Sequence, residues 1–149
     1  MDDFAFYHLR RARLEYALPK LLEKVTKRGR RAVVRVGSEA RLEDLNRHLW
    51  TYEERSFLAH GAASDGFAEA QPIYFTTATE NPNGASVLVL VDGAEPFATD
   101  QFDRCLNLFD GDDPVALGAA RERWRALKAA SEPVTYWQQS ERGGWKRRD

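Results

Sequence analysis

The sequence has few of the residues that build metal sites or crosslinks. Its 149 residues include one cysteine and three histidines. A single thiol cannot form an internal disulfide, and one thiol with three scattered histidines cannot build a structural zinc site. This composition favours a reducing cytosol, and it gives no reason to expect a metal ion or another cofactor.

Long apolar runs are also missing. No stretch approaches the roughly 20 apolar residues that a membrane-spanning helix needs. The first residues, MDDFAFYHLRR, place acids before a short apolar run, so they lack the successive charged, apolar and cleavage regions of a signal peptide. We therefore expect a cytoplasmic protein with no membrane partner.

The sequence motifs of nucleotide binding and nucleophilic catalysis do not occur. There is no GxxxxGK[ST], no GxGxxG and no GxSxG. Gly37 and Ser38 stand between a predicted strand and a predicted helix, where backbone N–H groups could hold a phosphate. The alternative is an ordinary strand-to-helix turn. A nucleotide-binding enzyme would depend on these two residues.

The remaining residues with metal-binding or catalytic side chains do not form the pattern of a known site. Residues 110–113 resemble part of a calcium loop, but Pro114 and the lack of a glutamate at the twelfth position break that pattern. The histidines have no ligand or triad spacing, and Cys105 lies in an apolar segment without a local base. We therefore expect no catalytic residue and no enzymatic activity of the chain itself.

The charge is unevenly distributed. Residues 61–120 carry 1 Lys or Arg against 10 Asp or Glu, whereas residues 121–149 carry 8 against 4. The net charge of −1 therefore hides a basic region near the C-terminal end. This asymmetry indicates an acidic partner for that region.

The length is close to that of one domain, and the apolar pattern predicts an α/β fold over residues 1–149. Pro19 interrupts the first predicted helix, so either that helix begins near Leu18 with proline in its first turn, or it kinks at proline. Strands are predicted over residues 4–9, 32–36, 56–60, 73–77, 86–91, 104–109 and 134–138, the last at a sheet edge; helices are predicted around residues 14–25, 38–49 and 114–130.

Alternation of strands and helices at the start of the chain predicts a largely parallel sheet. The link over residues 78–85 is too short for a parallel crossover, so the strands on either side of it are antiparallel neighbours or are not adjacent. The sheet is therefore expected to be mixed. The polar, basic residues 141–149 are expected to form a flexible tail.

The helix over residues 114–130 has two unlike faces at 100° per residue. One face carries Ala116, Ala119, Ala120, Leu127 and Ala130, and these mostly small side chains are expected to let the helix pack closely on the sheet. The other face carries Arg121, Trp124, Arg125 and Lys128 at i, i+3, i+4 and i+7.

This cationic face has two interpretations. In the first, Trp124 packs against the C-terminal segment and the cations keep the surface soluble. In the second, the cations bind carboxylates and the indole forms one wall of an apolar slot, which suits an acidic peptide with a hydrophobic end. A second candidate is a group of large apolar side chains. It belongs either to the core or to a groove that binds a partner. Its members are Leu49, Trp50, Tyr52 and Phe57.

An ordered series of segments resembles the chi subunit of bacterial DNA polymerase III, an accessory protein of the clamp-loader complex. The series is FYHL, RRAVVRVGSEARLEDLNRHLW, ERSFLAHG, QPIYF, VLVLVDG and ARERWRALK. The resemblance implies a Rossmann-like three-layer domain in which helices flank a mixed, mostly parallel sheet. It also implies a non-catalytic adaptor that binds the acidic C-terminal tail of single-stranded DNA-binding protein and links it to the clamp loader.

By position in ARERWRALK, the resemblance assigns tail binding to Arg121, Trp124 and Arg125. Lys128 is added from helical geometry alone. Trp50 and Phe57 match positions that face the psi subunit in better-known members of the family. Direct binding of single-stranded DNA by the basic helix is the other rival function, although only Trp124 is placed there for stacking.

Overall fold

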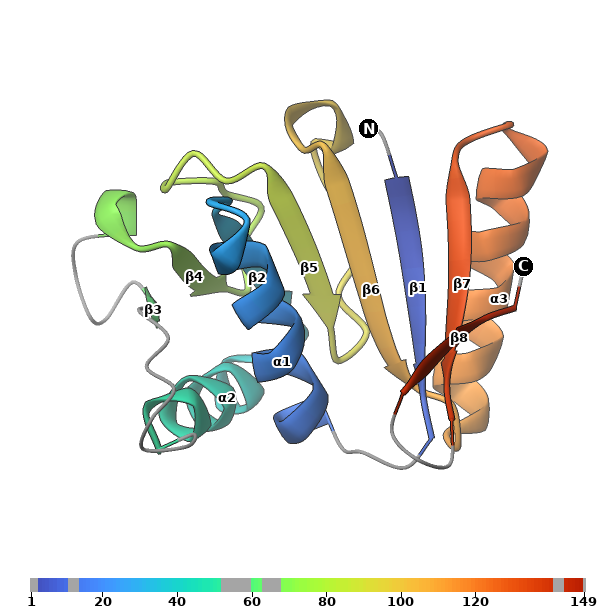
Figure 1. The fold of residues 1–149 in the computed structure, drawn as a ribbon, viewed down its shortest axis with the longest axis horizontal. Helices are drawn as coiled ribbons and strands as arrows, with labels where there is room; N and C mark the ends of the chain where they lie inside the picture. Colours follow the sequence, from blue (N-terminus) through green and yellow to red (C-terminus); the bar gives the residue numbers. More distant parts are fainter. Residues whose placement is uncertain (1–2, 11–13, 52–59, 63–67, 141–143, 149) are drawn as a thin grey trace.

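A sheet of eight strands organises the described part of the chain, in the order β3-β4-β2-β5-β6-β1-β7-β8 (Figure 1). The computed structural model describes residues 3–10, 14–51, 60–62, 68–140 and 144–148. All neighbouring strands pair in parallel except β7 and β8, which are antiparallel. This arrangement confirms the predicted mixed, mostly parallel sheet. The strands are β1 (Asp3–Leu9), β2 (Ala32–Val36), β3 (His60–Ala62), β4 (Ile73–Thr76), β5 (Val87–Val91), β6 (Arg104–Asp110), β7 (Val134–Gln139) and β8 (Trp145–Arg147), and the helices are α1 (Leu14–Lys27), α2 (Glu39–Thr51) and α3 (Pro114–Ala129).

The central strands are buried on both faces, which explains their continuous apolar sequences. All five residues of β5 are buried. Val87, Val89 and Val91 belong to one core cluster, whereas Leu88 and Leu90 belong to the other. Successive side chains of a strand point to opposite faces, so a parallel strand covered on both sides must be apolar throughout.

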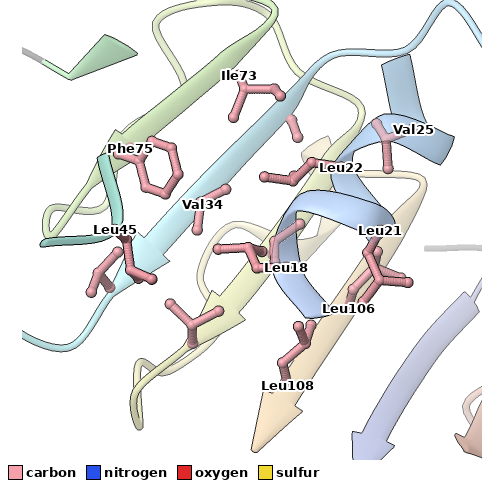
Figure 2. Close-up of a cluster of buried hydrophobic side chains, with 14 of the residues drawn as sticks. Leu18, Leu21, Leu22, Val25, Val34, Leu45, Ile73, Phe75, Leu106 and Leu108 are labelled. Atoms are coloured by element: carbon pink, nitrogen blue, oxygen red, sulfur yellow. The ribbon is translucent and has the colours of Figure 1, made fainter. Parts of the chain in front are cut away.

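Helices lie on both faces of the sheet. Helices α1 and α2 cover one face and α3 covers the other, so the fold has three layers (Figure 1). Figure 2 shows Leu18 and Leu22 of α1 packed over strand residues such as Val34. No helix of the described ranges is long and apolar enough to span a membrane.

Proline 19 lies inside α1. The helix begins at Leu14, so the alternative in which it begins near Leu18 was wrong. Pro19 has no N–H group, and the carbonyl of Glu15 therefore lacks the helical partner that residue 19 would otherwise supply. Pro19 is buried in the face that packs on the sheet, and this packing holds the helix together around the missing bond.

The strand order resolves one alternative and corrects two expectations. Strands β4 and β5 are not adjacent, because both pair with β2. Strand β7 is not at the edge, since β8 pairs with it inside the expected tail of residues 141–149. Trp145 packs against the core cluster on the α1 side, and this apolar contact explains why residues 145–147 are ordered as a strand. Most of the strand predicted over residues 56–60 lies outside the described residues.

Candidate functional site

The acidic run before α3 is a helix cap. Asp110 ends β6, and Asp113 is the N-cap of α3. One carboxylate oxygen of Asp113 accepts hydrogen bonds from the backbone N–H groups of Val115 (3.0 Å) and Ala116 (3.4 Å), and Pro114 occupies the first helical turn. A capping carboxylate followed by proline is a common helix start.

The faces of α3 differ from the predicted ones. Trp124 is half-buried and packs against the core cluster on this side of the sheet, together with Leu117 and Leu127. Ala119 and Ala130 are exposed, so their assignment to the packed face was wrong. The orientation of a helix on a sheet follows its largest apolar side chains, because burial of apolar area provides most of the free energy of packing.

A cavity of about 310 Å³ lies between α3, β1, β7 and the residue that follows β8. Arg121, Trp124 and Arg125, which the sequence singles out, meet in it. Lys128 lies beside it, with Nζ 5.4 Å from the centroid of the Trp124 ring. The cavity is lined by His8, Arg121, Trp124, Arg125, Tyr136, Gln138 and Arg148.

Two polar side chains of the sheet, one buried and one half-buried, form one wall of this cavity. A hydrogen bond of 2.8 Å joins Nδ1 of His8 and the hydroxyl of Tyr136. Burial lowers the pKa of His8, and burial raises the pKa of Tyr136. Both side chains are therefore neutral at neutral pH, and the charge of the cavity comes from its arginines.

Arg148 is held in place by two contacts with β7. Its backbone N–H donates to the carbonyl of Tyr136 (2.7 Å), and its Nε donates to Oε1 of Gln138 (3.0 Å). These contacts place a third guanidinium opposite Arg121 and Arg125 in the cavity. Arg148 was not predicted from the sequence, because that residue falls in the stretch expected to be a tail.

His8, Tyr136 and Gln138 were also missed. Their side chains share one face of the sheet because β1 and β7 pair in register, with Phe6 opposite Tyr136 and His8 opposite Gln138. The polar residues Thr135, Gln138 and Gln139 in β7 were a local signal for a partly exposed strand. The pairing of β1 with β7 joins residues about 130 positions apart, and no local pattern predicts it.

The arginines of the cavity are available to an anion. Among the described residues, no carboxylate forms an ion pair with Arg121, Arg125 or Arg148. Guanidinium groups bind carboxylates in paired, charge-assisted hydrogen bonds. The indole Nε1 of Trp124 is buried and has no hydrogen-bond partner among the described residues. The cavity thus combines an aromatic wall with uncompensated positive charge.

Gly37 and Ser38 have structural roles, and the group of large apolar side chains with Trp50 and Phe57 lies mostly outside the described residues. A Cβ at position 37 would clash with the backbone carbonyl of Asp92, so Gly37 allows two backbones to approach. The hydroxyl of Ser38 accepts a hydrogen bond from the backbone N–H of Arg41 (3.2 Å). Phe57 is not described, and Trp50 is described only as backbone within α2.

Cys105 is fully buried, and burial raises the pKa of its thiol. A buried thiol without a lowered pKa is a poor nucleophile. Within the described ranges, no group of three or more His, Cys, Asp or Glu side chains could hold a metal ion.

Gly111 fixes the geometry of the cavity, and we expect Gly111→Ala to disturb it. A Cβ at this position would overlap the ring of His8. Displacing a packed ring costs about 1–3 kcal/mol of unfolding free energy. Urea denaturation of the variant should therefore show a lower midpoint with an unchanged slope.

Gly118→Ala is the matched control for this change. Gly118 lies in α3, and a Cβ there would have no atom within 4 Å. Alanine is a better helix former than glycine, so this variant should gain about 0.5–1 kcal/mol. Equal destabilisation by both substitutions would contradict the assigned role of Gly111.

Comparison with known proteins identifies a family and a relative of the chain. A family model described as "DNA polymerase III chi subunit, HolC" matches residues 1–135. The curated "Probable DNA polymerase III subunit chi" of Rickettsia prowazekii (strain Madrid E) is 36% identical over 91 residues, which are 61% of this chain and 55% of that protein. The match therefore spans about half the length of that relative. The family match includes Arg121, Trp124 and Arg125 and ends before Tyr136.

Proposed function

The chain belongs to the DNA polymerase III chi subunit family, a family of replication accessory subunits, and on that basis we propose that it is a non-catalytic adaptor. Its ligand in this proposal is the acidic C-terminal tail of single-stranded DNA-binding protein. The observation that carries the proposal is the α3 cavity, where Arg121, Arg125 and Arg148 surround Trp124. Positive charge beside an aromatic wall fits an acidic peptide with an apolar end.

The size of the cavity suits the end of a peptide. A volume of about 310 Å³ is at the lower limit of small-molecule sites and leaves room for a terminal aromatic side chain. In the proposed complex that side chain packs against Trp124. The terminal carboxylate and the preceding aspartates then contact Arg121 and Arg125 on one side and Arg148 on the other.

The indole of Trp124 keeps its position through contacts on two sides. It packs against the core cluster below, and the ammonium group of Lys128 lies over its ring. This pre-formed arrangement lowers the entropy cost of ordering the ring when a ligand binds. Lys128 therefore acts in the proposal by holding the ring and by adding positive charge.

The adaptor role requires a second surface that contacts the clamp loader. We propose the end of α2 and the segment after it, which carry Trp50 and Phe57, as that surface, with the psi subunit as one candidate partner. These side chains lie outside the described residues, and the proposal for them depends on the family resemblance alone.

The nucleotide-dependent enzyme is the weaker alternative. Its candidate phosphate loop depends on Gly37, and the close approach to Asp92 explains that glycine without a ligand. Ser38 is likewise occupied as a helix cap.

Fluorescence polarisation of a labelled acidic peptide tests the tail-binding proposal. The peptide ends in Asp-Phe with a free carboxylate, and an otherwise identical peptide carries a C-terminal amide. We expect micromolar binding of the first peptide, weaker binding of the amide, and a loss of affinity as salt rises, because exposed charges are screened within about 10 Å at 0.1 M. Failure of the folded protein to bind either peptide at low salt would refute the proposal.

A further inference from the structure

A groove lies on the face of the sheet opposite the α3 cavity. Helix α1 covers the middle of this face and α2 packs against β2, β3 and β4, but no described helix crosses the face in front of β1 and β7 (Figure 1). A groove of about 340 Å³ runs there between α1 and the last strands. Its lining includes Tyr7, Lys24, Arg28, Arg104, Trp137 and Trp145.

Aromatic side chains from three strands form the wall of the groove. Tyr7 of β1 pairs in register with Trp137 of β7, and the rings of Tyr7 and Trp145 meet edge to face with centroids 5.0 Å apart. The indole Nε1 of Trp137 donates to Oγ1 of Thr135 (3.1 Å). Trp137 and Trp145 are both half-buried, so each keeps part of its surface exposed.

The rim of the groove is positively charged. Arg30 pairs with Asp103 (3.4 Å), and Arg104 pairs with Asp3 (2.9 Å). Lys24 and Arg28 have no ion-pair partner among the described residues and are exposed. Lys24 lies in the last turn of α1, and Arg28 directly follows Lys27, the last residue of that helix.

We propose that this groove binds single-stranded nucleic acid. Proteins that bind single strands without sequence preference combine cations that follow the phosphate backbone with aromatic rings on which bases stack. Lys24 and Arg28 supply the first element and the two tryptophans supply the second. The α3 helix has one such ring, Trp124, whereas this groove has two indoles.

The groove is well separated from the α3 cavity. The nucleic-acid groove and the α3 cavity lie on opposite faces of the sheet, since Trp137 packs with the α1-side cluster and Tyr136 with the α3-side cluster. The two ligands therefore bind without competing for space. The proposal does not depend on tail binding, because no residue lines both sites.

Polarisation of fluorescein-labelled oligo(dT) of 15 nucleotides, titrated with the full chain at low salt, tests this proposal. We expect salt-sensitive binding that weakens several-fold in Lys24→Ala and in Arg28→Ala. Removing one cation that neutralises a phosphate should reduce the slope of log affinity against log salt by about 0.7. Trp137→Leu, which keeps apolar bulk but removes the stacking surface, should weaken binding by about tenfold.

Arg121→Ala is the charge-matched control, since it removes one positive charge from the other face. It should leave oligo(dT) affinity unchanged, and Lys24→Ala and Arg28→Ala should leave acidic-peptide affinity unchanged. Lys24 and Arg28 are exposed, so their variants are expected to fold, and circular dichroism checks this. The proposal is overturned by absence of oligo(dT) binding at low salt, by an equal loss in Arg121→Ala, or by loss of acidic-peptide binding in the groove variants.

Discussion

Trp124→Ala is expected to weaken acidic-peptide binding by about 1–3 kcal/mol, or roughly 5- to 150-fold. The substitution removes the aromatic wall of the cavity between Arg121 and Arg125. It also removes the ring over which the ammonium of Lys128 lies. Polarisation of the labelled peptide that ends in Asp-Phe, or calorimetry with the unlabelled peptide, measures the change.

Three further variants identify the cause of this loss. Trp124→Phe keeps an aromatic wall and should retain most of the affinity, whereas Arg121→Ala should lose about as much as Trp124→Ala and show a weaker salt dependence. Arg47→Ala removes an exposed cation of α2 that pairs with Asp44, so it should change little. If Arg47→Ala and Arg121→Ala had equal effects, binding would depend on overall charge and not on the cavity.

Phe6→Ala is expected to lower the free energy of unfolding by about 3–5 kcal/mol, because truncating a buried phenylalanine leaves a cavity that the core fills only in part. Phe6 is 0% exposed. Its ring stacks on that of Phe4 at 5.1 Å and on that of Tyr136 at 6.3 Å. Urea denaturation followed by circular dichroism measures the loss.

Val115→Ala is the control for this substitution. Val115 is 80% exposed at the start of α3, so shortening it should change stability by no more than about 0.5 kcal/mol. A similar small change in Phe6→Ala would show that the core on the α3 side contributes little to the fold. Because Phe6 supports Tyr136, a folded Phe6→Leu variant should also bind the acidic peptide less tightly.

The fold was largely predictable because its signals are local. The all-apolar segment VLVLV requires a strand covered on both faces. The expectation that the short link after residue 77 excludes a parallel crossover was wrong, because β4 and β5 both run parallel to β2, which lies between them. The last strand was not predictable in the same way. Strand β8 depends on the contact of Trp145 with residues of the α1-side core, and that contact arises only in the folded chain.

The candidate site was predictable only in part, for a similar reason. Helical spacing brings Arg121, Trp124 and Arg125 together within two turns of one helix, and the family resemblance selected the same residues. Helical spacing alone placed Trp124 away from the sheet, whereas the structure packs the ring inward at the edge of the cavity. His8 and Arg148 could not be found locally, because pairing of β1 with β7, and of β7 with β8, brings them to α3.

The position of β1 in the sheet has a consequence for synthesis on the ribosome. Both of its neighbours, β6 and β7, lie far downstream in the sequence. Leu9 and Arg104 are 95 residues apart. At a synthesis rate of about 5–20 residues per second, roughly 5–20 s therefore pass between the synthesis of β1 and that of β6, the first strand with which it pairs. During that interval Phe4 and Phe6 belong to an unpaired strand, which other chains can recruit. The nascent protein is therefore most vulnerable to aggregation at its N-terminal strand, until the second half of the chain has emerged.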